Sequence, residues 1–200
     1  DIVTAPRSTG SILKPFLYAG LLHDGTLLPS TLVADIPLNL NGFMPQNYNK
    51  TFYGAVPAHV AVERSLNVPL VRMLTLYNTG RLMALLKTLG MSTLRFSEEH
   101  YGASLILGGA EGTLWDLTGM YASLARTLGH HRRYNWRYNP ADIHPLTPYP
   151  APAEEPIRSV ADKRLTDEAP LSRAAPLHLF SFSSSDLAAA FSASALLFPS

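Results

Sequence analysis

Apolar residues recur at helical spacing through the first 130 positions, in short segments separated by glycine or proline. This period is typical of helices that bury one face. It is found at approximately residues 11–21, 57–65, 69–77, 80–90 and 114–124. Residues 27–40 instead suggest short extended pieces, because Pro29 and Pro37 interrupt them. The pattern predicts a mainly helical body with a few short strands.

Length and composition limit the possible classes of protein. A chain of 200 residues with 46% apolar and 16% charged residues suits one globular domain. The formal net charge of +1 provides no electrostatic surface for nucleic acid, so no nucleic-acid partner is expected. No window of 18 apolar residues predicts a membrane span, and no signal peptide is visible. Because the chain begins at Asp1 without an initiator methionine, we expect a fragment or a processed piece.

Ser11 and Lys14 carry the first candidate chemistry. Three positions apart on a helix, they share one face, and the helix dipole at its start would favour a developing alkoxide on the serine. A serine nucleophile needs a base within reach, and a lysine can serve if burial lowers its pKa. The plain alternative is an ordinary helix start with a surface lysine, because Ser-x-x-Lys alone is a short motif.

The surrounding residues favour the catalytic interpretation. The run Pro-Arg-Ser-Thr-Gly-Ser-Ile-Leu-Lys-Pro-Phe at positions 6–16 closely resembles the nucleophile segment of class A penicillin-binding proteins, especially their 1C branch. These proteins are peptidoglycan transpeptidases. The resemblance implies an α/β (α+β) serine β-lactamase/transpeptidase-like fold, represented here mostly by its helical part with an incomplete sheet. It also implies a nucleophilic Ser11 and a basic Lys14, without a cofactor or metal.

Ser65 and Asn67 resemble the second motif of this family, Ser-x-Asn, which lies between two helices. Ser65 follows Ser11 by 54 residues, which is within the family's range. The resemblance implies that Ser65 relays a proton and that Asn67 holds Lys14 and the substrate amide. The alternative is that Asn67 caps the helix that follows. Glu63 begins a Glu-x-x-Leu-Asn pattern known from class A β-lactamases, but it overlaps Ser-x-Asn, so we expect it to end a helix.

Two further segments resemble this family. Residues 45–49 resemble a Pro-x-Asn-Tyr segment that precedes the second motif, yet taken singly they predict a plain surface loop. Residues 107–122 resemble a packing segment of the transpeptidase domain. In it, Thr113 and Asp116 predict a capping box before a helix, and Glu111 is expected to be structural.

The third motif of the superfamily is Lys-Thr-Gly or Lys-Ser-Gly on an active-site strand. None of the four lysines in this chain is followed by Thr-Gly or Ser-Gly, so the motif is missing from the sequence. The resemblance therefore predicts a partial transpeptidase domain over residues 1–130. Residues 131–176 are predicted to form a loop or linker, because eight of the sixteen prolines of the chain lie between positions 140 and 176. Residues 177–200 predict an atypical low-complexity tail that suggests truncation or a frameshift. His130, His131 and His144 lack the spacing of metal ligands.

The resemblance implies a peptidoglycan D,D-transpeptidase that forms an acyl-enzyme on Ser11. Its partners would be stem peptides ending in D-Ala-D-Ala and β-lactam antibiotics, in the periplasm or at the outer face of the inner membrane. Full-length members of the family are membrane-anchored, although this chain shows no membrane segment. The alternative is an inactive remnant without the Lys-Thr-Gly strand.

Overall fold

The computed structural model describes residues 1–133 and 139–147. The helices are α1 (Lys14–His23), α2 (Ala58–Glu63), α3 (Asn67–Tyr77), α4 (Thr79–Thr88), α5 (Glu98–Tyr101) and α6 (Leu114–Arg133), with 3₁₀ helices η1 (Gly102–Leu107) and η2 (Pro140–Asp142). The strands are β1 (Arg7–Ser8), β2 (Leu32–Asp35), β3 (Gly54–Pro57) and β4 (Glu111–Gly112). The fold is mixed α/β and mostly helical, as the sequence predicts.

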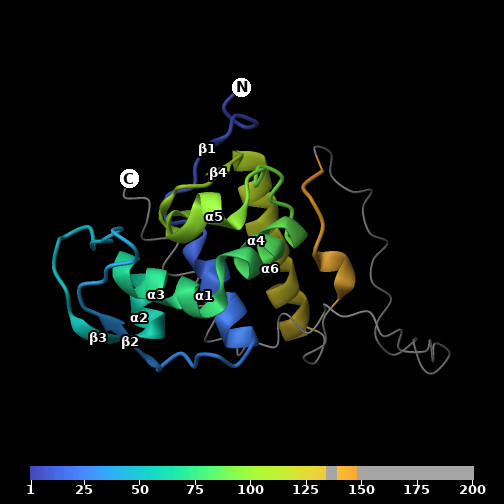
Figure 1. Cartoon of the computed structure of the whole chain (residues 1–200). Helices are drawn as coiled ribbons and strands as arrows, with labels where there is room; N and C mark the ends of the chain where they lie inside the picture. Colours follow the sequence, from blue (N-terminus) through green and yellow to red (C-terminus); the bar gives the residue numbers. More distant parts are fainter. Residues whose placement is uncertain (134–138, 148–200) are drawn as a thin grey trace.

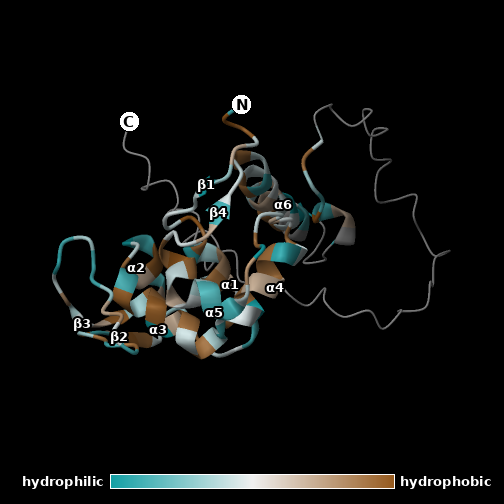
Figure 2. Ribbon diagram, turned by 45° about the horizontal axis from the view of Figure 1, so that its top comes forward, coloured by the Kyte–Doolittle hydropathy of each residue, from teal (hydrophilic) through white to brown (hydrophobic). Residues whose placement is uncertain are grey.

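Helix α1 forms the centre of the core. Every residue from Lys14 to Leu21 is buried, which is the pattern of a helix covered on all sides. Helices α2, α3 and α4 contact it, so the segment that contains Ser11 leads directly into the middle of the helical body (Figure 1). Hydrophobic residues, coloured brown, recur along the ribbons of these helices (Figure 2), and many of them are buried. A buried α1 means that any polar side chain at its start must find its partners inside the protein.

Helix α1 begins at Lys14, so the prediction that Ser11 itself starts the helix is wrong by one turn. Residues before Lys14 form a tight turn in which the amide of Lys14 donates to the carbonyl of Ser11 at 3.1 Å. Gly10 permits this turn with a φ of +52°. Pro15 lies at the second helical position, where its missing N–H costs little. The dipole end of the helix therefore lies at Lys14.

The strands form two small antiparallel sheets. Strand β1 pairs with β4, which brings the segment before Ser11 against residues about a hundred positions later. Strand β2 pairs with β3, with Asp35 opposite Gly54. Within residues 1–133 and 139–147, each sheet has two strands, so the sheets of the described part are small.

The other predicted helices are present. In α4, Leu82, Met83, Leu85 and Leu86 are buried and Gly90 follows with a φ of +107°, as expected for a helix stop. Thr113 caps α6, because its Oγ1 accepts from the amide of Asp116 at 3.0 Å. The reciprocal half of the capping box is not formed. The carboxylate of Asp116 instead accepts from the amide and hydroxyl of Ser92, at 2.9 and 2.6 Å, so it ties α6 to another segment.

Residues 139–147 form the last described segment and pack beside the end of the long helix α6. Helix α6 continues to Arg133, and residues 139–147 lie along it, with Arg126 donating to the carbonyls of Asp142 and His144. Most of the expected loop at 131–176 and the whole expected tail at 177–200 lie outside the described residues, and the proposed domain boundaries stay predictions. None of the helices in the described part of the chain is long and apolar enough to cross a membrane.

Candidate active site around Lys14

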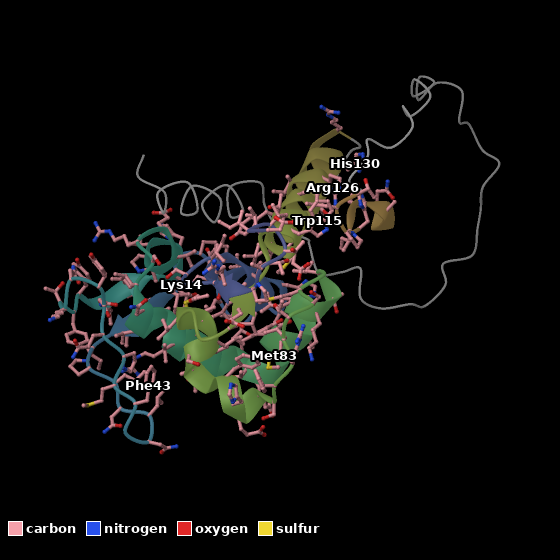
Figure 3. The ribbon with its side chains drawn as sticks, turned by 90° about the horizontal axis from the view of Figure 1, so that it is seen from above. Lys14, Phe43, Met83, Trp115, Arg126 and His130 are labelled. Atoms are coloured by element: carbon pink, nitrogen blue, oxygen red, sulfur yellow. The ribbon has the colours of Figure 1, made fainter. Side chains whose placement is uncertain are left out.

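Lys14 is the first residue of α1 and its side chain is almost completely buried, with 1% exposed. The interpretation of this residue as a surface lysine is therefore wrong. Desolvation lowers the pKa of Lys14 to about 7, because burial disfavours the charged ammonium. At neutral pH a substantial fraction of the amine is unprotonated, which is the property required of a base. Figure 3 places Lys14 within the helical body.

Three acceptors surround the Lys14 amine. Lys14 Nζ donates to the Ser65 carbonyl at 2.8 Å, to Ser65 Oγ at 3.0 Å and to Asn67 Oδ1 at 2.8 Å. An ammonium has three hydrogens, so all three donors are satisfied. All three acceptors are neutral, and among the described residues no carboxylate forms an ion pair with Lys14. The three hydrogen bonds therefore fix the position of the Lys14 amine, while desolvation favours its neutral form.

Ser65 reaches Lys14 because of the way in which α2 ends. The amide of Leu66 donates to the carbonyl of Ala61, and that of Ser65 donates to Val62, both at 2.9 Å. This is the Schellman arrangement, in which the residue after the helix cap is left-handed and is usually glycine. Ser65 occupies this position with a φ of +51°. A serine here accepts backbone strain, and both its carbonyl and its hydroxyl contact the Lys14 amine.

Asn67 is the first residue of α3. The alternative that its side chain caps this helix is wrong, since no side chain of the N-cap or of Asn67 bonds the free amides of α3. Its Oδ1 faces Lys14, and its Nδ2 donates to the carbonyl of Gln46 at 2.9 Å. The short α2–α3 connection thus presents both groups of the Ser-x-Asn motif to Lys14. Glu63 is the last residue of α2, as predicted.

The cap of α3 comes from a distant residue, Asn47. Its Oδ1 accepts from the amides of Asn67 at 2.9 Å and Val68 at 3.2 Å. Asn47 is 3% exposed, so the interpretation of residues 45–49 as a plain surface loop is wrong at this position. Sequence reasoning missed Asn47 and its partner Asp35. The available signal was the resemblance of this segment to a family motif.

Ser11 lies in the turn between β1 and α1 and is half-buried. It lines a cavity of about 420 Å³ together with apolar side chains that include Ile2, Ile12, Leu114 and Leu117. Its backbone is linked to Lys14, but no hydrogen bond joins Ser11 Oγ to another residue in the described part of the chain. The structure therefore brings Lys14, Ser65 and Asn67 into direct contact, and places Ser11 one turn away beside a cavity.

The turn that carries Ser11 is held by residues 108–112. The amide and hydroxyl of Thr9 donate to the carbonyl of Ala110, at 3.0 and 3.1 Å, and Ser8 Oγ donates to the carbonyl of Gly108 at 2.7 Å. A Cβ at Gly108 would lie only 2.9 Å from Gly10 Cα. Residues 107–109 (Leu-Gly-Gly) were expected only to pack the domain. They also permit the close approach that positions the turn of residues 8–13, which carries Ser11.

No group of three or more His, Asp or Glu side chains that could hold a metal ion occurs among the described residues. His130, at the end of α6 (Figure 3), instead contacts the carboxylate of Asp142.

Comparison with known proteins places this geometry in a family context. No protein-family model matches the sequence. The chain is 35% identical to penicillin-binding protein 1C of Escherichia coli K12 over 142 residues, which are 71% of this chain and 18% of that protein. It is 30% identical to penicillin-binding protein 1B of Vibrio cholerae over 132 residues, or 63% of this chain and 17% of that protein.

This chain is homologous to part of the class A penicillin-binding proteins. It spans less than a fifth of the length of these two penicillin-binding proteins.

Solved transpeptidase structures share its fold. Penicillin-binding protein PonA1 of Mycobacterium tuberculosis matches with a TM-score of 0.57 and 24% identity, over 64% of this chain and 36% of that one. Penicillin-binding protein 1A of Haemophilus influenzae matches with a TM-score of 0.54 and 25% identity, over 63% and 19%. PonA1 has also been solved in complex with penicillin V.

Proposed function

We propose that this chain carries the nucleophile half of a penicillin-binding D,D-transpeptidase site, with Ser11 as the nucleophile and Lys14 as its base. The observation that carries the proposal is the buried Lys14 amine, one turn from Ser11, bonded to both polar residues of a Ser-x-Asn connection. Such an arrangement suits acyl transfer, because a desolvated amine can take the proton of an adjacent serine at neutral pH.

The proposed reaction is acylation of Ser11 by a peptidoglycan stem peptide that ends in D-Ala-D-Ala. Ser11 Oγ attacks the carbonyl of the penultimate residue, and its proton passes to Lys14 Nζ. The C–N bond to the terminal D-Ala breaks, and the proton reaches the leaving amine. Ser65 Oγ, a hydroxyl that can donate as well as accept, relays this proton between Lys14 and the amine. An amine of a neighbouring stem then takes the acyl group and releases Ser11.

The same chemistry would open a β-lactam ring and leave the drug attached to Ser11. In this scheme no metal or cofactor takes part, and the site would act on peptidoglycan in the periplasm or at the outer face of the inner membrane. Glu63 ends α2 and does not bond Lys14, so the chain offers no support for rapid hydrolysis of the acyl-enzyme through that residue.

A fluorescent penicillin tests the proposal. We expect covalent labelling of the parent chain, loss of labelling in Ser11→Ala, and unchanged labelling in Ser30→Ala, which alters an exposed serine in a turn. Circular dichroism of each variant checks that it folds. A folded parent chain that takes no label, or a Ser11→Ala variant that labels like the parent, would contradict the proposed acylation.

The alternative proposal is a non-catalytic remnant that packs against other cell-wall proteins. The absence of Lys-Thr-Gly and Lys-Ser-Gly from all 200 residues favours it, because the strand that carries this motif supplies an oxyanion-hole donor in the family. Loss of one such donor typically lowers a rate by about 10²–10³. The remnant predicts no labelling of a well-folded chain, even after long incubation with the fluorescent penicillin.

A further inference from the structure

Asp35, at the end of β2, anchors a buried polar network that leads to the Lys14 site. Its side chain is completely buried. The carboxylate accepts from Asn47 Nδ2 at 2.8 and 3.0 Å, and from the amide of Tyr53 at 3.0 Å. A buried carboxylate without such donors would be strongly destabilising. The position of the Asn47 amide group is therefore tightly coupled to Asp35.

The orientation of the Asn47 amide is determined by its neighbours. Its Nδ2 has only acceptors beside it, namely the Asp35 carboxylate and the carbonyl of Thr51 at 2.9 Å. Its Oδ1 has only donors beside it, the first two amides of α3. Turning the amide over would place donor against donor and acceptor against acceptor. Asn47 thus holds the start of α3 in one position.

Asn67 is held at two points by this segment. Its backbone amide donates to Asn47 Oδ1, and its Nδ2 donates to the carbonyl of Gln46. With the backbone and the amide nitrogen both fixed, Asn67 Oδ1 is left facing Lys14 Nζ at 2.8 Å. A continuous series of hydrogen bonds therefore runs from Asp35 through Asn47 and Asn67 to the Lys14 amine.

We propose that Asn47 is a positioning residue for the Lys14 site, acting with Asp35 to hold Asn67 Oδ1 against the amine. The catalytic consequence of this inference rests on the proposed acylation of Ser11. The groups that bond the amine are the Ser65 carbonyl, the Ser65 hydroxyl and the Asn67 amide. All are neutral, so Asn67 Oδ1 is one of three interactions that favour the ammonium against desolvation.

The first experiment measures the pKa of Lys14 and needs no enzymatic activity. The chain contains four lysines, so NMR of protein labelled with ¹³C at lysine Cε gives few signals, and Lys14→Met identifies the one of interest. We expect Asn67→Ala to lower the pKa of Lys14 by on the order of half to one unit, because one acceptor of the ammonium is lost. Asn47→Ala should lower it similarly.

The double variant and a control separate positioning from general damage. If Asn47 acts through Asn67, adding Asn47→Ala to Asn67→Ala should leave the pKa of Lys14 where Asn67→Ala alone puts it. Asn39→Ala, which removes an exposed side-chain contact to the amide of Gly42 in the same β2–β3 connection, should leave it unchanged. Asp35→Asn keeps the side-chain volume and offers a milder route if Asn47→Ala does not fold. An unchanged pKa of Lys14 in every folded Asn47 or Asp35 variant would overturn the inference.

The second experiment follows acylation by penicillin and separates noncovalent affinity from the acylation rate constant. We expect Asn47→Ala to slow acylation by on the order of tenfold or more with little change in affinity. The slowing should nearly vanish in the Asn67→Ala background. Equal slowing in both backgrounds would contradict the positioning role. Lack of labelling in the parent chain would count against the proposed function, while the NMR titration would still decide the inference.

Discussion

The buried Lys14 amine should make the free energy of unfolding increase as the pH rises above 7. Burial lowers the pKa of Lys14 from 10.5 to about 7. Above pH 7 the folded chain therefore gives up a proton that the unfolded chain keeps until about pH 10.5. Since stability rises with pH wherever the unfolded state binds more protons, the free energy of unfolding should increase across this window.

The size of the effect follows from the shift in pKa. A shift of one unit corresponds to about 1.4 kcal/mol, so the full penalty for burying the ammonium is on the order of 5 kcal/mol. It is fully present below pH 7 and is relieved as the pH approaches 10.5. Between pH 7 and 9, the free energy of unfolding should rise by about 2 kcal/mol from Lys14 alone.

Urea denaturation followed by circular dichroism measures this change at a series of pH values. Lys14→Met is the matched control, because methionine has a similar length and no charge. Subtracting its curve from that of the parent removes the contributions that the two proteins share. We expect the difference to grow in favour of the parent between pH 7 and 9. Parallel curves would show that the pKa of Lys14 is not lowered, and would remove the physical basis for the proposal that it acts as a base.

Two further predictions concern backbone geometry. Ser65 has a φ of +51°, so Ser65→Gly should be more stable than Ser65→Ala by about 1 kcal/mol. Both variants lose the hydroxyl, but only alanine keeps the strain of the left-handed backbone. Equal urea midpoints for the two variants would argue against the Schellman end of α2. Gly108→Ala should lower the free energy of unfolding by about 2–4 kcal/mol, because the residue has a φ of +97° and an added Cβ would lie 2.8 Å from Ser8 Oγ. The control Gly25→Ala, at a φ of +68° with no atom within 4 Å, should lose only the conformational part, about 1–2 kcal/mol. Similar losses at both glycines would contradict the close packing of the serine turn.

The helices were largely predictable because their signals are local. The apolar spacing of residues 80–90 and the glycine stop that follows correspond closely to α4. Thr113 was recognisable as a cap for the same reason, since a helix start depends on a few neighbouring residues. The start of α1 was predicted one turn too early. Residues 9–14 form turns in which an amide bonds the carbonyl three residues before it, and such turns have nearly the same apolar spacing as a helix.

The polar contacts of the site were less predictable. Asp116 stands at the last position of a capping-box sequence, yet its carboxylate accepts a hydrogen bond from Ser92, 24 positions earlier. Asn47 lies in a segment rich in turn residues, yet it caps α3 from 20 positions away. In both cases a tertiary partner competed successfully with the local one, and no local pattern states which partner will be near.

The sequence by itself determined which residues could carry chemistry: the Ser11–Lys14 spacing, the Ser65–Asn67 pair and the helices that bear them. Only the tertiary structure decided what chemistry they can do. Packing of α2, α3 and α4 around α1 removes water from Lys14, and the Asp35–Asn47 network turns Asn67 toward it. The physical reason is that helix formation depends on neighbours along the chain. The desolvation and hydrogen bonding that tune an amine depend on groups that meet only in the folded protein.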